Sequence, residues 1–312
     1  MSGWAYRKKI TIAGSVGAGT NYQVLLKIGE SSGASGADFN LEGLSAKFPS
    51  GKNDGGDLRF TASDGVTLQD FWVESVSGTS PNRVAKVWVK VSADLGTNQD
   101  IYCYFRNPNA TNASNGDNTF LFFDDFSSNT LSNYTETQDS GNEVAYSYDS
   151  SNQRVNISNV DIDYHWLMHN TQNVSNNKIK TKLVSGRDSG LNFRYQNINN
   201  FYIVDAGDSD WGNVLRIWKK VAGTWTLLAT PSINNPVGSV NDLVIGFIGT
   251  TLYVWWNNSL VVNGLNLGTD FSSGKFGYST YRSTGWGDDL IVGKFVYPEP
   301  AFSSAGSVEK RN

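Results

Sequence analysis

Apolar and polar side chains alternate along most of this chain. Residues 22–28 place apolar side chains at every second position, with Gln23 and Lys27 between them. Residues 85–91 repeat the pattern, and there Trp88 is expected to face outward between two lysines. A period of two residues is that of a β-strand, whose successive side chains point to opposite faces of a sheet. Since no convincing amphipathic helix accompanies these segments, the sequence predicts an all-β protein.

Composition argues against several classes of partner. Across 312 residues, 25 Lys and Arg against 29 Asp and Glu give a net charge of -4, so no basic surplus exists to attract nucleic acid or an anionic membrane. No apolar run approaches the ~18 residues of a membrane-spanning helix, and the N-terminus lacks the apolar stretch of a signal peptide. Cys103 is the only cysteine, which excludes an intrachain disulfide. We expect no nucleic-acid partner and no membrane insertion.

A polar segment divides the chain. Residues 107–118 consist of Asn, Pro, Ala, Thr, Ser, Gly and Asp, which cannot pack a core and which break a β ladder. With the boundary placed there, we predict a β-sandwich over residues 1–115, a second β-sandwich over residues 116–298 and a C-terminal tail over residues 299–312. The second region contains more strand-like segments than one sheet holds comfortably, which favours two packed sheets.

The second region resembles the concanavalin A-like, laminin-G-like jelly-roll family. The resemblance rests on four segments in order, Phe122–Ser127, Gly190–Val204, Leu252–Val261 and Gly274–Val292. It implies a jelly-roll sandwich in which the opening and closing strands are neighbours, and it implies carbohydrate binding.

The first region resembles an uncharacterised β domain, a domain-of-unknown-function family of archaeal, bacterial and phage surface proteins. Its segments are Trp4–Ile12, Asp57–Thr61, Phe71–Glu74, Val87–Val91 and Tyr102–Pro108, and Arg106 departs from the family's Tyr-Gly-Asn-Pro ending. The residues from Pro298 to Glu309 resemble the ending of such proteins. The resemblance implies an extracellular, cell-surface or virion location.

Two pairs of aspartates suggest a structural calcium ion. Asp124 and Asp125 lie in the opening strand of the jelly roll, and Asp288 and Asp289 lie in its closing strand. Calcium prefers carboxylate and carbonyl oxygens, and the resemblance implies a calcium ion between these neighbouring strands. The alternative is that all four are ordinary turn and edge residues.

Tryptophans in polar loops suggest sugar binding. Trp211 and Trp286 lie in glycine-containing loops, and an exposed ring of this kind can stack on the apolar face of a sugar. Trp255 precedes Trp256 in one strand, so one of the two faces away from the core. Further candidates for the ligand-binding set are Tyr281, Arg194 and Arg282, with Asn192 beside them. Large sandwiches also bury many aromatic residues, so a core role is the alternative.

Hydrolytic chemistry finds little support in the sequence. Jelly-roll glycosidases need paired carboxylates on one face, yet the Glu-x-Asp-x-x-Glu motif is absent and Asp161 and Asp163 are followed by no glutamate. His165 and His169 share a face but are expected ~13 Å apart along a strand, too far to hold one metal ion.

We therefore predict a non-catalytic carbohydrate-binding or surface-recognition protein whose partner is a glycan or cell-surface polysaccharide. The alternative is a structural component of a virion or appendage, such as a phage decoration or tail protein, which would also contact other virion or surface proteins. A divergent glycoside hydrolase ranks third.

Overall fold

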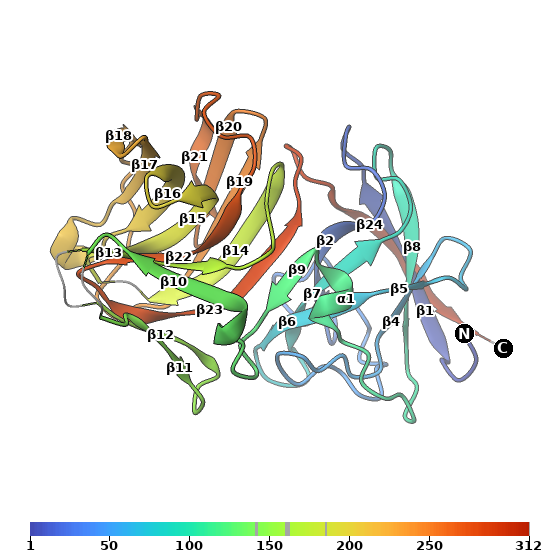
Figure 1. Ribbon diagram of the computed structural model, residues 1–312. Coiled ribbons are helices and arrows are strands. Elements are labelled where there is room, and N and C mark those ends of the chain that lie inside the picture. The colour runs from blue at the N-terminus through green and yellow to red at the C-terminus, as the bar shows by residue number, and fades with distance from the viewer. Residues whose placement is uncertain (141–142, 160–162, 185, 312) are drawn as a thin grey trace. The chain divides into compact units, whose positions relative to one another are not determined.

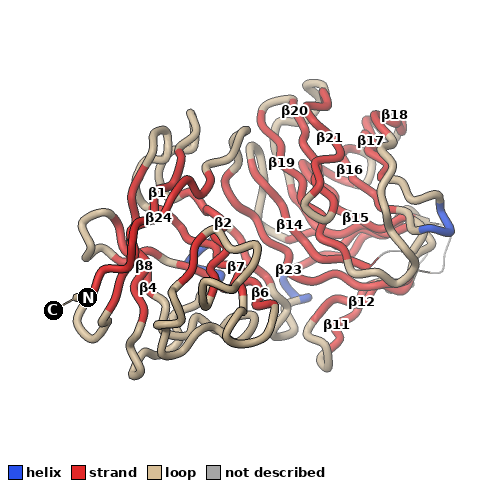
Figure 2. Tube along the Cα trace, turned by 180° about the vertical axis from the view of Figure 1, so that it is seen from behind, coloured by secondary structure: helices blue, strands red, loops and turns tan. Residues whose placement is uncertain are grey.

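The computed structural model describes residues 1–140, 143–159, 163–184 and 186–311. Nearly all regular structure in this part of the chain is β, as Figures 1 and 2 show, which confirms the predicted fold class. The chain divides into two compact units. Unit 1 comprises Met1–Leu121 with Val296–Asn312, and unit 2 comprises Phe122–Phe295.

Unit 1 contains two sheets around one apolar core. Within the described residues, the first has the order β24–β1–β8–β4–β5, with bounds Ala301–Lys310, Tyr6–Ala13, Gln99–Phe105, Arg59–Ala62 and Leu68–Gln69. The second has the order β3–β2–β7–β6, with bounds Phe39–Asn40, Tyr22–Gly29, Val84–Val91 and Phe71–Ser77. The alternating apolar residues of β2 and β7 are buried in the core, as their spacing predicts.

Trp88 lies on the side of β7 that faces away from this core, yet it is buried. The ring of Phe120 contacts it edge-on with centroids 5.6 Å apart, and Phe120 also contacts Trp72. The short helix α1 (Gly116–Thr119) leads directly into Phe120. Phe120, just after the polar segment, therefore packs against residues of unit 1. The boundary between the units falls after Leu121 instead of after residue 115.

The C-terminal residues form a strand of unit 1, where the sequence predicts a separate tail. Strand β24 pairs antiparallel with β1 from Tyr6 opposite Lys310 to Ala13 opposite Ala301. Phe302, Ala305 and Val308 pack against the core, each only partly buried. The pairing of the first and last strands of a chain leaves no local sequence signal, since the partners lie about 300 residues apart.

Unit 2 contains two larger antiparallel sheets, visible at the left of Figure 1. In the described residues, a seven-stranded sheet has the order β10–β13–β22–β15–β16–β17–β18, with bounds Tyr134–Gln138, Tyr164–His169, Lys275–Tyr281, Asp188–Asn197, Asn200–Ala206, Leu215–Val221 and Thr224–Ala229. An eight-stranded sheet has the order β11–β12–β23–β14–β19–β20–β21, with bounds Tyr146–Asp149, Arg154–Ser158, Thr284–Lys294, Asn177–Val184, Asn241–Ile248, Thr251–Trp256 and Ser259–Asn266. Its eighth strand, β9 (Phe122–Asp124), pairs with β23.

The two sheets of unit 2 enclose a single large core. Leu191, Phe193, Tyr202 and Val204 from the seven-stranded sheet meet residues such as Ile245 from the eight-stranded sheet. Phe193 stacks on Phe247 across this interface with ring centroids 4.8 Å apart. Unit 2 is therefore a β-sandwich, and the pairing of β9 with β23 makes its opening and closing strands neighbours, as the resemblance implies. No helix of the described residues is long and apolar enough to cross a membrane.

The position of β24 leads to a test by truncation. A chain that ends at Pro300 loses the whole β24–β1 pairing and the ion pair between Arg7 and Glu309, whose atoms lie 2.7 Å apart. The apolar residues that β24 buries would also be lost, at ~25 cal/mol per Å² of apolar surface. We expect calorimetry of the truncated chain to show a lower Tm for unit 1 and an unchanged transition for unit 2. An unchanged unit 1 would make residues 301–312 dispensable.

Candidate functional site

The seven-stranded sheet of unit 2 has a second apolar layer on the face that points away from the core. Trp166, Met168, Tyr195, Phe201 and Ile203 form this layer and are buried, and partly buried Tyr164, Ile198, Trp218 and Trp225 pack against them. Alternation explains the arrangement on β13 and β16, because Leu167 and Tyr202 on these strands enter the main core. On β15, Phe193 enters the core and Tyr195 the aromatic layer, because the register of the strand shifts between them. We call this surface, with the residues at its edge described below, the aromatic face.

A series of ring contacts runs across the aromatic face. Tyr164 stacks on Trp166 with centroids 5.8 Å apart and on Trp225 at 5.0 Å, and it contacts Tyr281 at 4.9 Å. Trp225 in turn contacts Trp218 at 5.9 Å. Tyr164, Trp218, Trp225 and Tyr281 are all partly exposed, so their rings present apolar surface to a ligand.

Charged residues close one end of the aromatic face. The guanidinium of Arg187 lies 3.8 Å from the ring centre of Trp211 and 5.2 Å from that of Tyr281. Asp188 accepts a 2.6 Å hydrogen bond from Arg216, whose other amino group donates to the carbonyl of Trp211. Trp211 itself lies in the short helix η2 (Ser209–Trp211), and 42% of its surface is exposed. Aromatic rings and charged hydrogen-bonding groups thus meet on one accessible surface.

Asp205 lies beneath these groups and is fully buried. Its carboxylate accepts hydrogen bonds from Tyr164 at 3.3 Å and from Ser279 at 3.5 Å. Burial, with the nearby charge of Asp188, holds the pKa of Asp205 well above its usual range. A buried carboxylate of this kind destabilises the folded state at neutral pH, where it must be ionised or take up a proton.

Two polar side chains inside the aromatic layer have no hydrogen-bond partner in the described part of the chain. They are the indole N–H of Trp166 and the amide of Asn192, for which both the oxygen and the nitrogen are unpartnered and buried. Asn192 lies opposite Ile203 on one side and Gly277 on the other, so it belongs to the same face. Unpartnered buried polar groups are costly, and the aromatic face therefore retains unused hydrogen-bonding capacity beneath its rings.

The sequence-predicted ligand residues fall into separate places. Trp211 and Tyr281 come together on the aromatic face through Arg187. Trp286 packs under Arg154 at 4.7 Å, and both lie on the outward side of the eight-stranded sheet. Trp255 also faces outward there, against Phe295, while Trp256 is buried in the core, as the alternation predicts. Trp286 and Trp255 thus lie on the other sheet from Trp211.

Of the two predicted arginines, Arg282 directly follows Tyr281 of the aromatic face, whereas Arg194 lies elsewhere. Arg194 lies near the far end of β15 from Asp188, where it lines a pocket between loops. Arg282 is exposed in the turn between β22 and β23. The single region expected for Tyr281, Arg194 and Arg282 does not form, because the length of β15 separates Arg194 from the other two.

The four aspartates proposed for calcium lie on the neighbouring strands β9 and β23 or directly beside them. Asp124 accepts hydrogen bonds from Thr130 at 2.7 Å, Tyr134 at 2.8 Å and the backbone N–H of Phe126 at 3.0 Å. Asp125 is also buried, and it accepts a 3.1 Å bond from the N–H of Ser127.

Asp288 and Asp289 differ in their surroundings. Asp289 is buried and lies 2.5 Å from the ammonium of Lys182. Asp288 accepts the backbone N–H of Asp289 at 2.7 Å. Among the described residues, no three His, Cys, Asp or Glu side chains are grouped to hold a metal ion. Lys182 supplies a neutralising charge that the sequence did not reveal, and calcium binding here stays a prediction.

Both histidines make contacts within the described part of unit 2. Nδ1 of the buried His165 lies 2.9 Å from the carboxylate of Glu136, an ion pair within the sandwich if the ring is protonated. His169 packs edge-on against Phe122 at 4.7 Å. Asp161 lies outside the described residues.

Comparison with known proteins finds a partial family match and solved structures of low similarity. A family model described as a domain of unknown function (DUF2341) matches residues 54–139, less than a third of the 312 residues, and crosses from unit 1 into unit 2. No curated protein sequence matches the chain.

Three solved structures illustrate the similarity. The carbohydrate-binding module CBM66 from Bacillus subtilis is 15% identical, with 51% of this chain and 95% of that chain covered and a TM-score of 0.43. A Bacillus subtilis protein of unknown function with a galectin-like fold is 8% identical, covers 56% and 96%, and has a TM-score of 0.46. The GH43 BlXynB protein from Bacillus licheniformis is 13% identical, covers 73% and 47%, and has a TM-score of 0.42. At these TM-scores, the description of unit 2 as a sandwich rests on its own sheets.

The burial of Asp205 predicts a pH dependence of stability. Because its folded-state pKa is raised above the ordinary value of 3.8, the folded protein binds a proton more tightly than the unfolded chain. Protonated Asp205 therefore favours the folded state at pH values below about 3.8. This contribution to the free energy of unfolding is lost as the pH rises from there through the raised pKa of the folded state. We expect Asp205→Asn to raise the Tm of unit 2 at pH 7 and to change it much less at pH 4. An equal loss of Tm at both pH values would show that the hydrogen bonds of Asp205 outweigh its charge.

The calcium prediction is tested by melting curves with and without metal. If calcium binds the native state at Asp124, Asp125, Asp288 and Asp289, a hundredfold excess over its Kd should stabilise unit 2 by about 2.7 kcal/mol, and EGTA should reverse the effect. Asp125→Asn should abolish the response. If EGTA leaves the curve unmoved and elemental analysis finds no metal, the four aspartates are ordinary turn and edge residues.

Proposed function

We propose that unit 2 binds a carbohydrate on the aromatic face and that the protein acts as a non-catalytic recognition protein. The observation that supports this most directly is a set of accessible rings on one face. Tyr281, Tyr164, Trp225 and Trp218 are in successive contact, and Arg187 lies between Tyr281 and Trp211. The flat, apolar side of a sugar ring packs well on such surfaces, while its hydroxyls need polar partners at the edge.

The polar partners are present at both sides of the rings. Asp188, Arg187 and Arg216 stand at one end, and their carboxylate and guanidinium groups suit paired hydroxyls. Lys220 lies 5.0 Å from the ring centre of Trp225 and pairs with Asp139 at 3.3 Å. Several rings in succession suit an oligosaccharide or polysaccharide better than a single sugar.

The same surface argues for binding without hydrolysis. Glycosidases place two accessible carboxyl groups about 5–9 Å apart on either side of the scissile bond. Here Asp205 is fully buried, and Arg216 holds Asp188 in an ion pair beside it. We therefore propose that these carboxylates shape the site and do not cut the glycan. A virion or cell-surface location and contacts with other surface proteins stay predictions, and a glycan-binding face is compatible with either.

Paired tryptophan substitutions test the proposal. A glycan array probed with the whole protein identifies a ligand, and calorimetric titration then measures its Kd. We expect Trp211→Ala and Trp225→Ala each to weaken binding by about 1–3 kcal/mol, as for stacking contacts at a binding hot spot. Trp211 is 42% exposed, so its replacement should leave the Tm nearly unchanged.

Trp255→Ala and Trp286→Ala are the matched controls, since both tryptophans are partly exposed on the other sheet. They should bind the glycan like the wild type. The proposal is wrong if the controls lose binding while Trp211→Ala keeps it, or if no glycan on a broad array is retained.

A further inference from the structure

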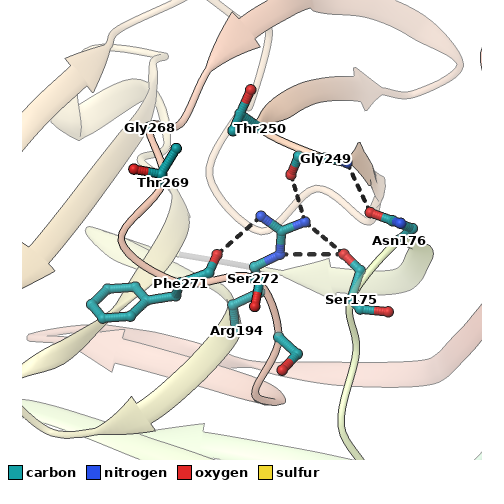
Figure 3. A pocket seen from close by; sticks show the side chains of 10 residues that line it. Ser175, Asn176, Arg194, Gly249, Thr250, Gly268, Thr269, Phe271 and Ser272 are labelled. Atoms are coloured by element: carbon teal, nitrogen blue, oxygen red, sulfur yellow. Dashed lines mark hydrogen bonds between the residues drawn. The ribbon is translucent and has the colours of Figure 1, made fainter.

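A pocket of about 470 Å³ lies at the edge of unit 2, among loops that carry none of the aromatic-face residues. Four segments form it: the residues before β14, the bulged end of β15, the turn between β19 and β20, and the loop between β21 and β22. Figure 3 shows the guanidinium of Arg194 amid these loops. The volume falls within the range of ~300–1,000 Å³ usual for small-molecule sites.

Arg194 holds the pocket together. It is 1% exposed and has a positive φ of 49°, in a stretch where the pairing of β15 with β22 shifts register. Its guanidinium donates to the carbonyl of Ser175 from two nitrogens, at 3.2 and 2.6 Å, and to the carbonyls of Phe271 at 3.2 Å and Gly249 at 2.8 Å. Three separate loops are thus fastened to one side chain.

The charge of Arg194 is not cancelled by a carboxylate. Its partners are neutral carbonyls, and no ion pair to it occurs among the described residues. The carboxylate nearest in the lining loop, Asp270, pairs with Lys219 at 2.9 Å. The four bonds leave one N–H of the guanidinium available, because an arginine carries five. A full positive charge therefore stands at the base of the pocket, in surroundings where water screens it poorly.

The remaining lining consists of small polar groups. Thr250, Thr269, Ser272 and Ser273 supply hydroxyls, and Asn176 supplies an amide whose oxygen accepts the N–H of Gly249 at 2.8 Å. The NH₂ group of that amide remains a donor. The described lining residues include neither Asp nor Glu, so nothing among them repels an anion.

We infer that this pocket binds an oxyanion group, a carboxylate or sulfate, carried by a small polar molecule such as an acidic sugar. The positive base attracts the anionic group, and the hydroxyls and the amide donate hydrogen bonds to its oxygens or to neighbouring hydroxyls. The inference does not depend on the aromatic face, since the two places share no residue.

Amide chemical shifts of the whole protein provide the test, with sodium glucuronate, methyl glucoside and sodium sulfate as probes. We expect glucuronate to shift the amides of Gly249, Thr250 and Gly268 and to bind at least about tenfold more tightly than methyl glucoside. Added salt should weaken glucuronate binding and leave the glucoside unaffected. If sulfate causes the same shifts as glucuronate, the pocket recognises the anionic group itself. If glucuronate causes them and sulfate does not, the sugar ring also contributes to binding. Both results support the inference.

Substitution of an exposed pocket residue avoids the risk that Arg194→Met fails to fold. Ser272→Trp should fill the pocket and weaken glucuronate binding at least about tenfold, with an unchanged Tm. Ser151→Trp, at an exposed turn elsewhere in unit 2, is the matched control, and Trp211→Ala should also bind glucuronate normally. Equal affinity for glucuronate and methyl glucoside, no shift with either anion, or normal binding by Ser272→Trp would each overturn the inference. Those results would leave glycan binding at the aromatic face untouched.

Discussion

Successive side chains of a β-strand point to opposite faces of its sheet, and the seven-stranded sheet of unit 2 uses both faces for apolar residues. In β16, Tyr202 and Val204 enter the core while Phe201 and Ile203 form the aromatic layer. The arrangement depends on close strand pairing at the centre of the sheet. A Cβ at Gly190 would stand 1.8 Å from the carbonyl oxygen of Val204, so only glycine fits there.

The buried polar and charged groups of the aromatic face lower the stability of unit 2, whereas a face made only of packed apolar residues would not. Asp205 is buried near Asp188, and the amide of Asn192 has no partner among the described residues. Natural proteins keep such features mainly where a ligand uses them. The ion pairs of Arg216 with Asp188 and of Lys220 with Asp139 limit the cost and hold the polar groups beside the rings.

Alternation made the strands and the inward or outward direction of many side chains predictable from the sequence, including the division of Trp255 from Trp256. It could not reveal which strands are neighbours. Tyr164 on β13 and Trp225 on β18 lie five strands apart in the order of the sheet, so no local signal in the sequence reveals that their rings meet. One clue was available: the turn at Ala222 and Gly223 closes the hairpin that places Trp225 opposite Lys220. The ion pair of Lys182 with Asp289 and the pairing of Ala301–Lys310 with β1 could not be predicted either, because both join segments that lie far apart in the sequence.

The indole N–H signals of the ten tryptophans give the most direct test of the central claim, that unit 2 recognises its ligand on the aromatic face. During titration with a glycan that the protein retains, we expect shifts for Trp211, Trp218, Trp225 and Trp166, whose indole N–H has no hydrogen-bond partner among the described residues. We expect unchanged signals for Trp255 and Trp286 on the other sheet. Shifts confined to Trp255 and Trp286, or to the tryptophans of unit 1, would show that the ligand does not bind at the aromatic face.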